Sequence, residues 1–151
     1  MNAKDIITTL GLQRHPEGGW YVQTFKDGDA ADGRSRSTAI YYLLEAGETS
    51  HWHRVDAVEV WHFYAGAPLR LSLSDGVTVE AHELGSDLVA GQRPQVVVPQ
   101  GVWQAAVSLG DFTLVGCTVA PGFAFSGFEL AARDWAPNAN RDGKPVGLQA
   151  P

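Results

Sequence analysis

Short apolar segments separated by turn residues are the feature that most constrains how this chain can fold. Each segment is rich in β-branched and aromatic residues, and Gly, Pro, Asp or Ser stands in the gaps. No period of helical length lies between one segment and the next. This pattern predicts an all-β protein, either a sandwich or a barrel. The expected strands are residues 20–25, 38–44, 50–53, 59–65, 69–73, 77–83, 95–98, 103–108 and 112–119.

The two ends of the chain differ from this strand-rich body. Asn2 can cap a short helix that ends at Gly11. Residues 123–132 fit either a short helix or a strand. Periodicity then disappears, and Pro and Gly recur up to the last residue. The sequence thus predicts one domain over residues 1–136, followed by an irregular tail over residues 137–151.

Composition narrows the range of functions. A length of 151 residues suits one domain, and 44% hydrophobic against 19% charged residues argues against disorder. The formal net charge of −6 repels phosphate backbones and anionic lipids, so we expect neither nucleic acid nor a membrane as partner. Cys117 is the single cysteine, which excludes an intrachain disulfide. We therefore expect a cytoplasmic protein, and we expect the thiol to be buried and inert.

The residues that could carry chemistry gather in the segment from 47 to 66. His51 and His53 are two apart, and on a regular strand both imidazoles would lie on one face, where they could bind one metal ion. Glu59 begins the next expected strand and shares a face with aromatic residues, where an ionised carboxylate needs a partner or a cation. Gln104 follows a Pro-Gln-Gly turn, and its amide could point into the same cavity.

These residues resemble the first motif of the cupin proteins. His51, His53, Glu59 and Gly66 match that motif, and the turn at residues 99–101 resembles the start of the second. Five residues separate His53 from Glu59, where three or four are usual in cupins. Gln104 stands where the second motif normally has a histidine ligand.

A narrower resemblance covers most of the chain. Leu12, the run His15-Pro16-Glu17-Gly18-Gly19, and residues 37–44, 50–64, 101–104 and 120–123 are similar to the cupin-five family. That family consists of small single-domain cupins without a settled biochemical function, and the longer spacing and the glutamine are usual in it. The resemblance implies a β-jelly-roll barrel, similar in fold to the dTDP-sugar epimerases. It does not carry their activity, because one fold hosts many functions.

Three classes of function remain open from the sequence, all of them built on a small molecule, a sugar or a small organic acid, held in the barrel. The first, which we expect, is a metal-assisted enzyme with His51, His53, Glu59 and Gln104 around Zn, Fe, Mn or Ni. The second is a metal-free epimerase or isomerase, in which a histidine beside Glu59 takes a proton and Tyr42 or Tyr21 returns one. The third is a binding module without chemistry.

The sequence also suggests positions for several further residues. We expect Glu17, Trp61, Phe63 and Trp103 to line the ligand pocket, although the three aromatic residues also fit a core position. His15 is expected on the surface. Four arginines could form a phosphate site if they converge: Arg34, Arg36, Arg54 and Arg70.

The expected strand at residues 59–65 also predicts a homodimer. Glu59, Trp61 and Phe63 lie on one face, and the other face carries Val60, His62 and Tyr64, with Val58 beside them. A strand with one face in water should alternate apolar and polar residues, and this one does not. A barrel has one interior, so the second face needs another cover, and a twofold partner would supply it.

Overall fold

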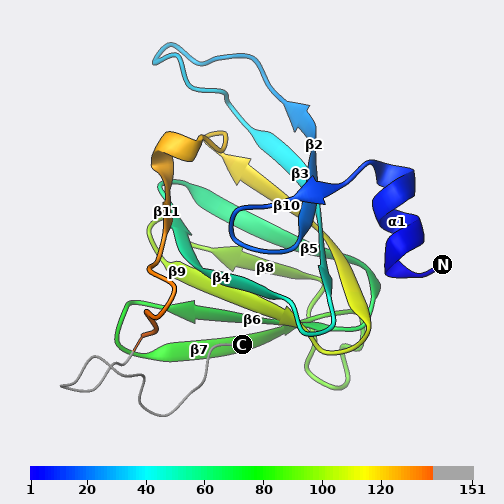
Figure 1. The fold of residues 1–151 in the computed structure, drawn as a ribbon. Helices are drawn as coiled ribbons and strands as arrows, with labels where there is room; N and C mark the ends of the chain where they lie inside the picture. Colours follow the sequence, from blue (N-terminus) through cyan, green and yellow to red (C-terminus); the bar gives the residue numbers. More distant parts are fainter. Residues whose placement is uncertain (138–151) are drawn as a thin grey trace.

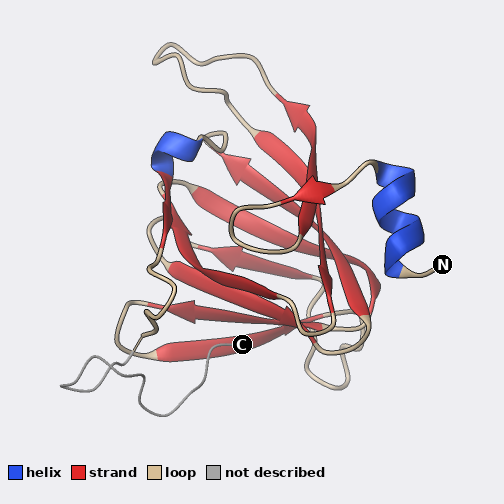
Figure 2. Ribbon diagram, viewed as in Figure 1, coloured by secondary structure: helices blue, strands red, loops and turns tan. Residues whose placement is uncertain are grey.

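The computed structural model describes residues 1–137, and within them two antiparallel sheets face each other (Figures 1 and 2). The expected tail lies, apart from Pro137, outside the described residues. The six-stranded sheet has the order β1 (Gln13–Arg14), β2 (Trp20–Lys26), β3 (Thr38–Glu45), β10 (Phe112–Ala120), β5 (Val58–Gly66) and β8 (Gln95–Val98). The five-stranded sheet has the order β11 (Phe128–Leu130), β4 (Thr49–Val55), β9 (Trp103–Ser108), β6 (Leu69–Ser74) and β7 (Val79–Leu84).

The predicted all-β architecture is confirmed, and the nine expected segments correspond to β2 through β10. One strand was not expected, β1, which is two residues long. Residues 123–132 contain both of the elements considered for them, a single 3₁₀ turn (η1, Phe125–Gly127) and β11.

The main core lies between the sheets and takes side chains from both. Tyr42 and Val115 enter it from the six-stranded sheet, and Leu71 enters from the five-stranded sheet. Trp61 is 1% exposed and spans the interior, where its indole Nε1–H donates to Gln104 Oε1 across the two sheets. These contacts fill part of the space between the sheets and leave the region around the ends of β2, β3 and β4 for a cavity.

The N-terminal helix α1 (Ala3–Leu10) covers part of the outer face of the six-stranded sheet. Asn2 caps it, with a reciprocal hydrogen bond to Asp5, and Gly11 ends it at a φ of 68°. Ile6 packs with Leu43 of β3, and Figure 1 shows α1 beside this sheet. The predicted helix is therefore confirmed, and it gives Leu43 a cover within the chain itself.

The rest of that outer face keeps large apolar groups in contact with solvent. Val58 is 41% exposed, Tyr64 is 52% exposed and Val97 on β8 is 55% exposed. The strand β5 is thus apolar on both of its faces, as the sequence indicates. Among the described residues, no helix has the length and apolar character needed to cross a bilayer.

Candidate functional site

The turn at residues 15–19 docks against β4 and carries two titratable side chains into the barrel. The His15 N–H donates to Gly19 O at 2.9 Å, and the Gly18 N–H donates to His15 O at 3.0 Å. Gly18 has a φ of 107°, and a Cβ at this position would overlap the Thr49 carbonyl oxygen. Only glycine allows this close approach of the turn to β4. The turn is held further by Tyr42, whose hydroxyl donates to the Gly18 carbonyl oxygen.

A β-bulge in β4 separates the two histidines of the His-x-His pair. Ser50 pairs with Ala106 and His53 pairs with Gln104, so β4 contains one more residue than β9 over this interval. The extra backbone N–H, that of His51, donates to Glu17 O at 2.8 Å in the docked turn. The expectation that His51 and His53 share a face is therefore wrong, because it assumed a regular strand.

His51 points away from the interior. Its Nε2–H donates to the Ala132 carbonyl oxygen at 2.9 Å, and its side chain does not line the cavity. His53, two residues further on, is 2% exposed and faces inward.

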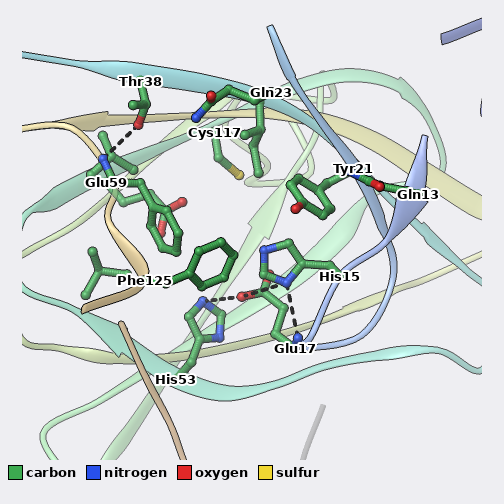
Figure 3. A pocket seen from close by; sticks show the side chains of 14 residues that line it. Gln13, His15, Glu17, Tyr21, Gln23, Thr38, His53, Glu59, Cys117 and Phe125 are labelled. Atoms are coloured by element: carbon green, nitrogen blue, oxygen red, sulfur yellow. Dashed lines mark hydrogen bonds and ion pairs between the residues drawn. The ribbon is translucent and has the colours of Figure 1, made fainter. Parts of the chain in front are cut away.

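The cavity has a volume of about 290 Å³ and opens between the sheets (Figure 3). Its lining combines titratable groups, polar groups and aromatic rings. Figure 3 shows Glu59 and Tyr21 on opposite sides of it, with the Glu17–His53 pair along the lower wall. The lining residues are Gln13, His15, Glu17, Tyr21, Gln23, Thr38, Ile40, His53, Val55, Glu59, Cys117, Val119, Phe123 and Phe125.

Glu17 and His53 form a buried ion pair. The distance from His53 Nε2 to Glu17 Oε2 is 3.0 Å, and the two side chains are 3% and 7% exposed. Burial lowers the pKa of His53, but the charge and hydrogen bond of Glu17 outweigh it and raise the pKa to about 8. For Glu17, burial alone would raise the pKa. The charge and hydrogen bond of His53 outweigh burial, so the pKa of Glu17 is lowered. Since His53 Nδ1–H also donates to the His51 carbonyl oxygen at 2.8 Å, both ring nitrogens carry protons in the pair.

Glu59 is a second buried carboxyl group, and no cationic side chain within residues 1–137 contacts it directly. Gln104 Nε2–H donates to Glu59 Oε1 at 2.8 Å, and the Cys117 thiol lies against the same carboxyl. Burial raises the pKa of Glu59 to about 7, a shift that the charge of His53 reduces and the charge of Glu17 increases. The pKa of the Cys117 thiol is raised well above its usual range by burial and by Glu59. At neutral pH, Glu59 can therefore both accept and release a proton.

His15 lies in the cavity wall and not on the surface, which corrects the expectation from the sequence. It is 9% exposed, and its Nδ1 accepts the Glu17 backbone N–H at 3.1 Å. A neutral ring that accepts at Nδ1 carries its proton on Nε2. Burial lowers the pKa of His15, more than the neighbouring Glu17 raises it, so the neutral ring is favoured. His15 thus presents one N–H donor beside Tyr21, whose ring centre is 4.5 Å away.

The remaining expected site residues divide into two groups. Glu17 lines the cavity as expected. Tyr42 and Trp61 lie in the core outside the lining, and Phe63 packs against that core. Trp103 faces the outer side of β9, against Trp135 and under the Arg54 guanidinium. The aromatic residues that do line the cavity are Tyr21, Phe123 and Phe125.

The four side chains expected as metal ligands do not fit a common metal ion. His51 is directed to Ala132, and the amide of Gln104 uses its oxygen for Trp61 and its nitrogen for Glu59. His53 has both ring nitrogens engaged. Within residues 1–137, no group of three or more His, Cys, Asp or Glu side chains is arranged to hold a metal ion. The structure does bring His53, Glu59 and Gln104 together, while it leaves His51 outside.

Two facing antiparallel sheets with a cavity between them match the double-sheet jelly roll, an architecture that cupins share with other proteins. The family described as cupin superfamily (DUF985) matches residues 4–131, and the chain belongs to this family. No curated protein matches the chain.

Several solved structures resemble this one. A protein from Shewanella oneidensis is 43% identical, with a TM-score of 0.84 over 87% of this chain and 85% of that chain. A hypothetical protein from Leishmania major is 28% identical, with a TM-score of 0.80 over 87% of this chain and 88% of that one. Oxalate decarboxylase from Bacillus subtilis, for which Mn(II) centres are named, is 10% identical, with a TM-score of 0.59 over 79% of this chain and 30% of that chain. At that identity the likeness extends to the fold alone.

Proposed function

We propose that the cavity binds a small carbonyl compound and moves a proton on the carbon next to the carbonyl, as an epimerase or isomerase does. The observation that carries this proposal is a buried carboxyl group, Glu59, whose pKa is about 7, facing a cavity with a phenol on its other side. A base works best when its pKa lies near the working pH. A pair of titratable groups with separated pKa values, here Glu59 and Glu17, is also typical of acid–base sites.

The groups in the cavity suit the separate tasks of such a reaction. Glu59 takes the proton from carbon, so a C–H bond breaks and a carboxyl O–H bond forms. The electron pair moves onto the carbonyl oxygen, where the His15 Nε2–H donates a hydrogen bond to the enolate. Tyr21 gives a proton to carbon from the other side and is reprotonated from solvent, while Glu59 releases its proton to solvent. The net change is inversion at that carbon.

This assignment replaces the histidine base considered from the sequence. His53 is the ionised partner of Glu17 and donates from both ring nitrogens, so it has no lone pair for a substrate proton. Tyr42 donates to the Gly18 carbonyl oxygen from within the core, which makes Tyr21 the better proton donor. A metal-assisted reaction on His51, His53, Glu59 and Gln104 finds less support, because three of these four groups are engaged elsewhere.

Deuterium exchange tests the proposal. The protein is incubated in D₂O with dihydroxyacetone, fructose, sorbose and tagatose, and NMR follows loss of the proton next to the carbonyl. We expect exchange above the buffer rate with the wild type and none above it with Glu59→Gln. A ligand that binds without exchange would instead support a binding module. Exchange that is lost after treatment with a chelator and restored by Mn²⁺ or Zn²⁺ would support the metal-assisted class.

A further inference from the structure

Among residues 1–137, none of those that line the cavity carries a permanently cationic side chain. The lining includes two carboxyl groups and two histidines, and neither Lys nor Arg is among the fourteen residues that form it. The arginines that could serve a phosphate site do not converge there. Arg34 forms two hydrogen bonds with the Asp56 carboxylate, at 3.0 and 2.7 Å. Arg54 binds Glu129 and lies over the Trp103 ring.

The fourteen described residues that line the cavity leave no unpaired cation for an anion to bind. The imidazolium of His53 is already neutralised by Glu17 at 3.0 Å. Glu59 adds negative charge whenever it is ionised, and the favoured form of His15 is neutral. A carboxylate or phosphate entering this space would lose its water without gaining a cation, and it would face like charges.

The mouth of the cavity instead offers neutral hydrogen-bonding groups and an aromatic face. Gln13 and Gln23 line it from β1 and β2, and among residues 1–137 neither side-chain amide has a hydrogen-bond partner. Each amide has both donors and an acceptor available. Phe125, on η1, also lines the cavity and is 55% exposed. Hydroxyl groups pair with free amides, and the C–H face of a sugar ring packs on an exposed aromatic ring.

We propose that the cavity selects an uncharged polyhydroxylated carbonyl compound of monosaccharide size and rejects the carboxylated or phosphorylated form of the same compound. That the ligand has a carbonyl group rests on the proposed function, whereas its lack of charge rests on the residues that line the cavity. A volume of about 290 Å³, at the small end of ligand pockets, limits the ligand to about one sugar ring.

Matched pairs of ligands test the proposal. Binding of fructose is compared with that of fructose 6-phosphate, and binding of glucose with that of glucuronate, by ligand-observed NMR at pH 7.5. We expect the uncharged member of each pair to bind at least tenfold more tightly. Equal or tighter binding of the anionic members, or no binding of either uncharged sugar at 50 mM, would overturn the proposal.

A variant of the protein that adds a positive charge tests the same proposal. Gln23→Arg places a cation at the mouth, and we expect it to raise the affinity for fructose 6-phosphate about tenfold. Thr24→Arg is the control, because Thr24 is the exposed next residue on β2 and does not line the cavity. A similar gain in affinity for fructose 6-phosphate in both variants would count against the proposal. So would no gain in either variant, provided that both have the melting temperature of the wild type. Tight binding of uncharged sugars without deuterium exchange would refute the proposed reaction and leave the selection by charge intact.

Discussion

The carboxyl group of Glu59 is destabilising to the fold when it is ionised. Its pKa is raised from 4.5 to about 7, so folding favours the protonated form. The cost is absent below pH 4.5, grows between pH 4.5 and 7, and is fully present above pH 7. At about 1.4 kcal/mol per pKa unit, ionisation of this group costs the folded state up to about 3 kcal/mol.

Glu59→Gln should therefore stabilise the protein at alkaline pH. The glutamine has the same shape and can still accept the hydrogen bond from Gln104. We expect the free energy of unfolding to exceed that of the wild type by up to about 3 kcal/mol at pH 8.5, and the difference to vanish near pH 4.5. Denaturant unfolding at four pH values measures it. A difference that does not depend on pH would contradict the raised pKa.

The charged forms of Glu17 and His53 should stabilise the fold, whereas the charged form of Glu59 destabilises it. His53 has a raised pKa, so its contribution to stability is fully present below pH 6.5 and is lost as pH rises through about 8. The lowered pKa of Glu17 makes its contribution present above pH 4.5 and lost at lower pH. The pair thus stabilises the fold most between about pH 4.5 and 6.5, and this stabilisation declines as the pH rises through about 8.

Glu17→Gln should remove this contribution and move the pKa of His53 from about 8 to below 6.5, because burial would then dominate. We expect a loss of about 3 kcal/mol in the free energy of unfolding at pH 7. NMR of the His53 ring protons follows the pKa. Glu80→Gln is the matched control, since Glu80 lies 3.6 Å from His82 but is 77% exposed, and its stability should stay near that of the wild type.

At the scale of elements, the docked turn at residues 15–19 determines where the titratable groups lie. Gly18 has a positive φ and also faces the Thr49 carbonyl oxygen, whereas Gly33 has a φ of 83° with no atom within 4 Å of an added Cβ. Gly33→Ala should cost about 1–2 kcal/mol from backbone strain alone. Gly18→Ala adds a steric overlap and should cost about 3 kcal/mol or more. Thermal unfolding compares the two, and equal losses would mean that the turn is not held against β4.

The sequence predicts the regular elements better than the site, and the turn explains why. Strand and helix signals are local, so β2 through β10 and α1 follow from them. The two residues of β1 are too few to give a pattern, and around β11 the sequence left helix and strand open. Glu59 and Gln104 face inward, as the alternation of side chains along a regular strand predicts. Glu59 lies in a regular stretch of β5 paired with β8, and Gln104 lies in a regular stretch of β9 paired with β6. His51 does not face inward, because strand parity fails at a bulge whose extra N–H bonds to Glu17 O. That contact joins segments more than thirty residues apart, and no local pattern indicates it.

At the scale of the whole molecule, the homodimer stays a prediction. Helix α1 covers the outer face around Leu43 but leaves Val58, Tyr64 and Val97 exposed on β5 and β8. A second copy that presents the same face would bury them. Light scattering at micromolar concentration should give twice the 16.2 kDa of one chain, and Val97→Asp should halve that mass. A wild-type mass of one chain, unchanged on dilution, would defeat this prediction.

The central claim is that a buried carboxyl group titrates near neutral pH beside an ion pair that is already formed. The most direct test is an NMR titration of protein with ¹³C-labelled glutamate side chains, with the Glu59 and Glu17 signals assigned by the two glutamine variants. We expect the Glu59 signal to move with a midpoint near pH 7, and Glu17 to remain ionised throughout that range. A Glu59 midpoint near 4.5, the ordinary value for a solvated carboxyl group, would contradict the account.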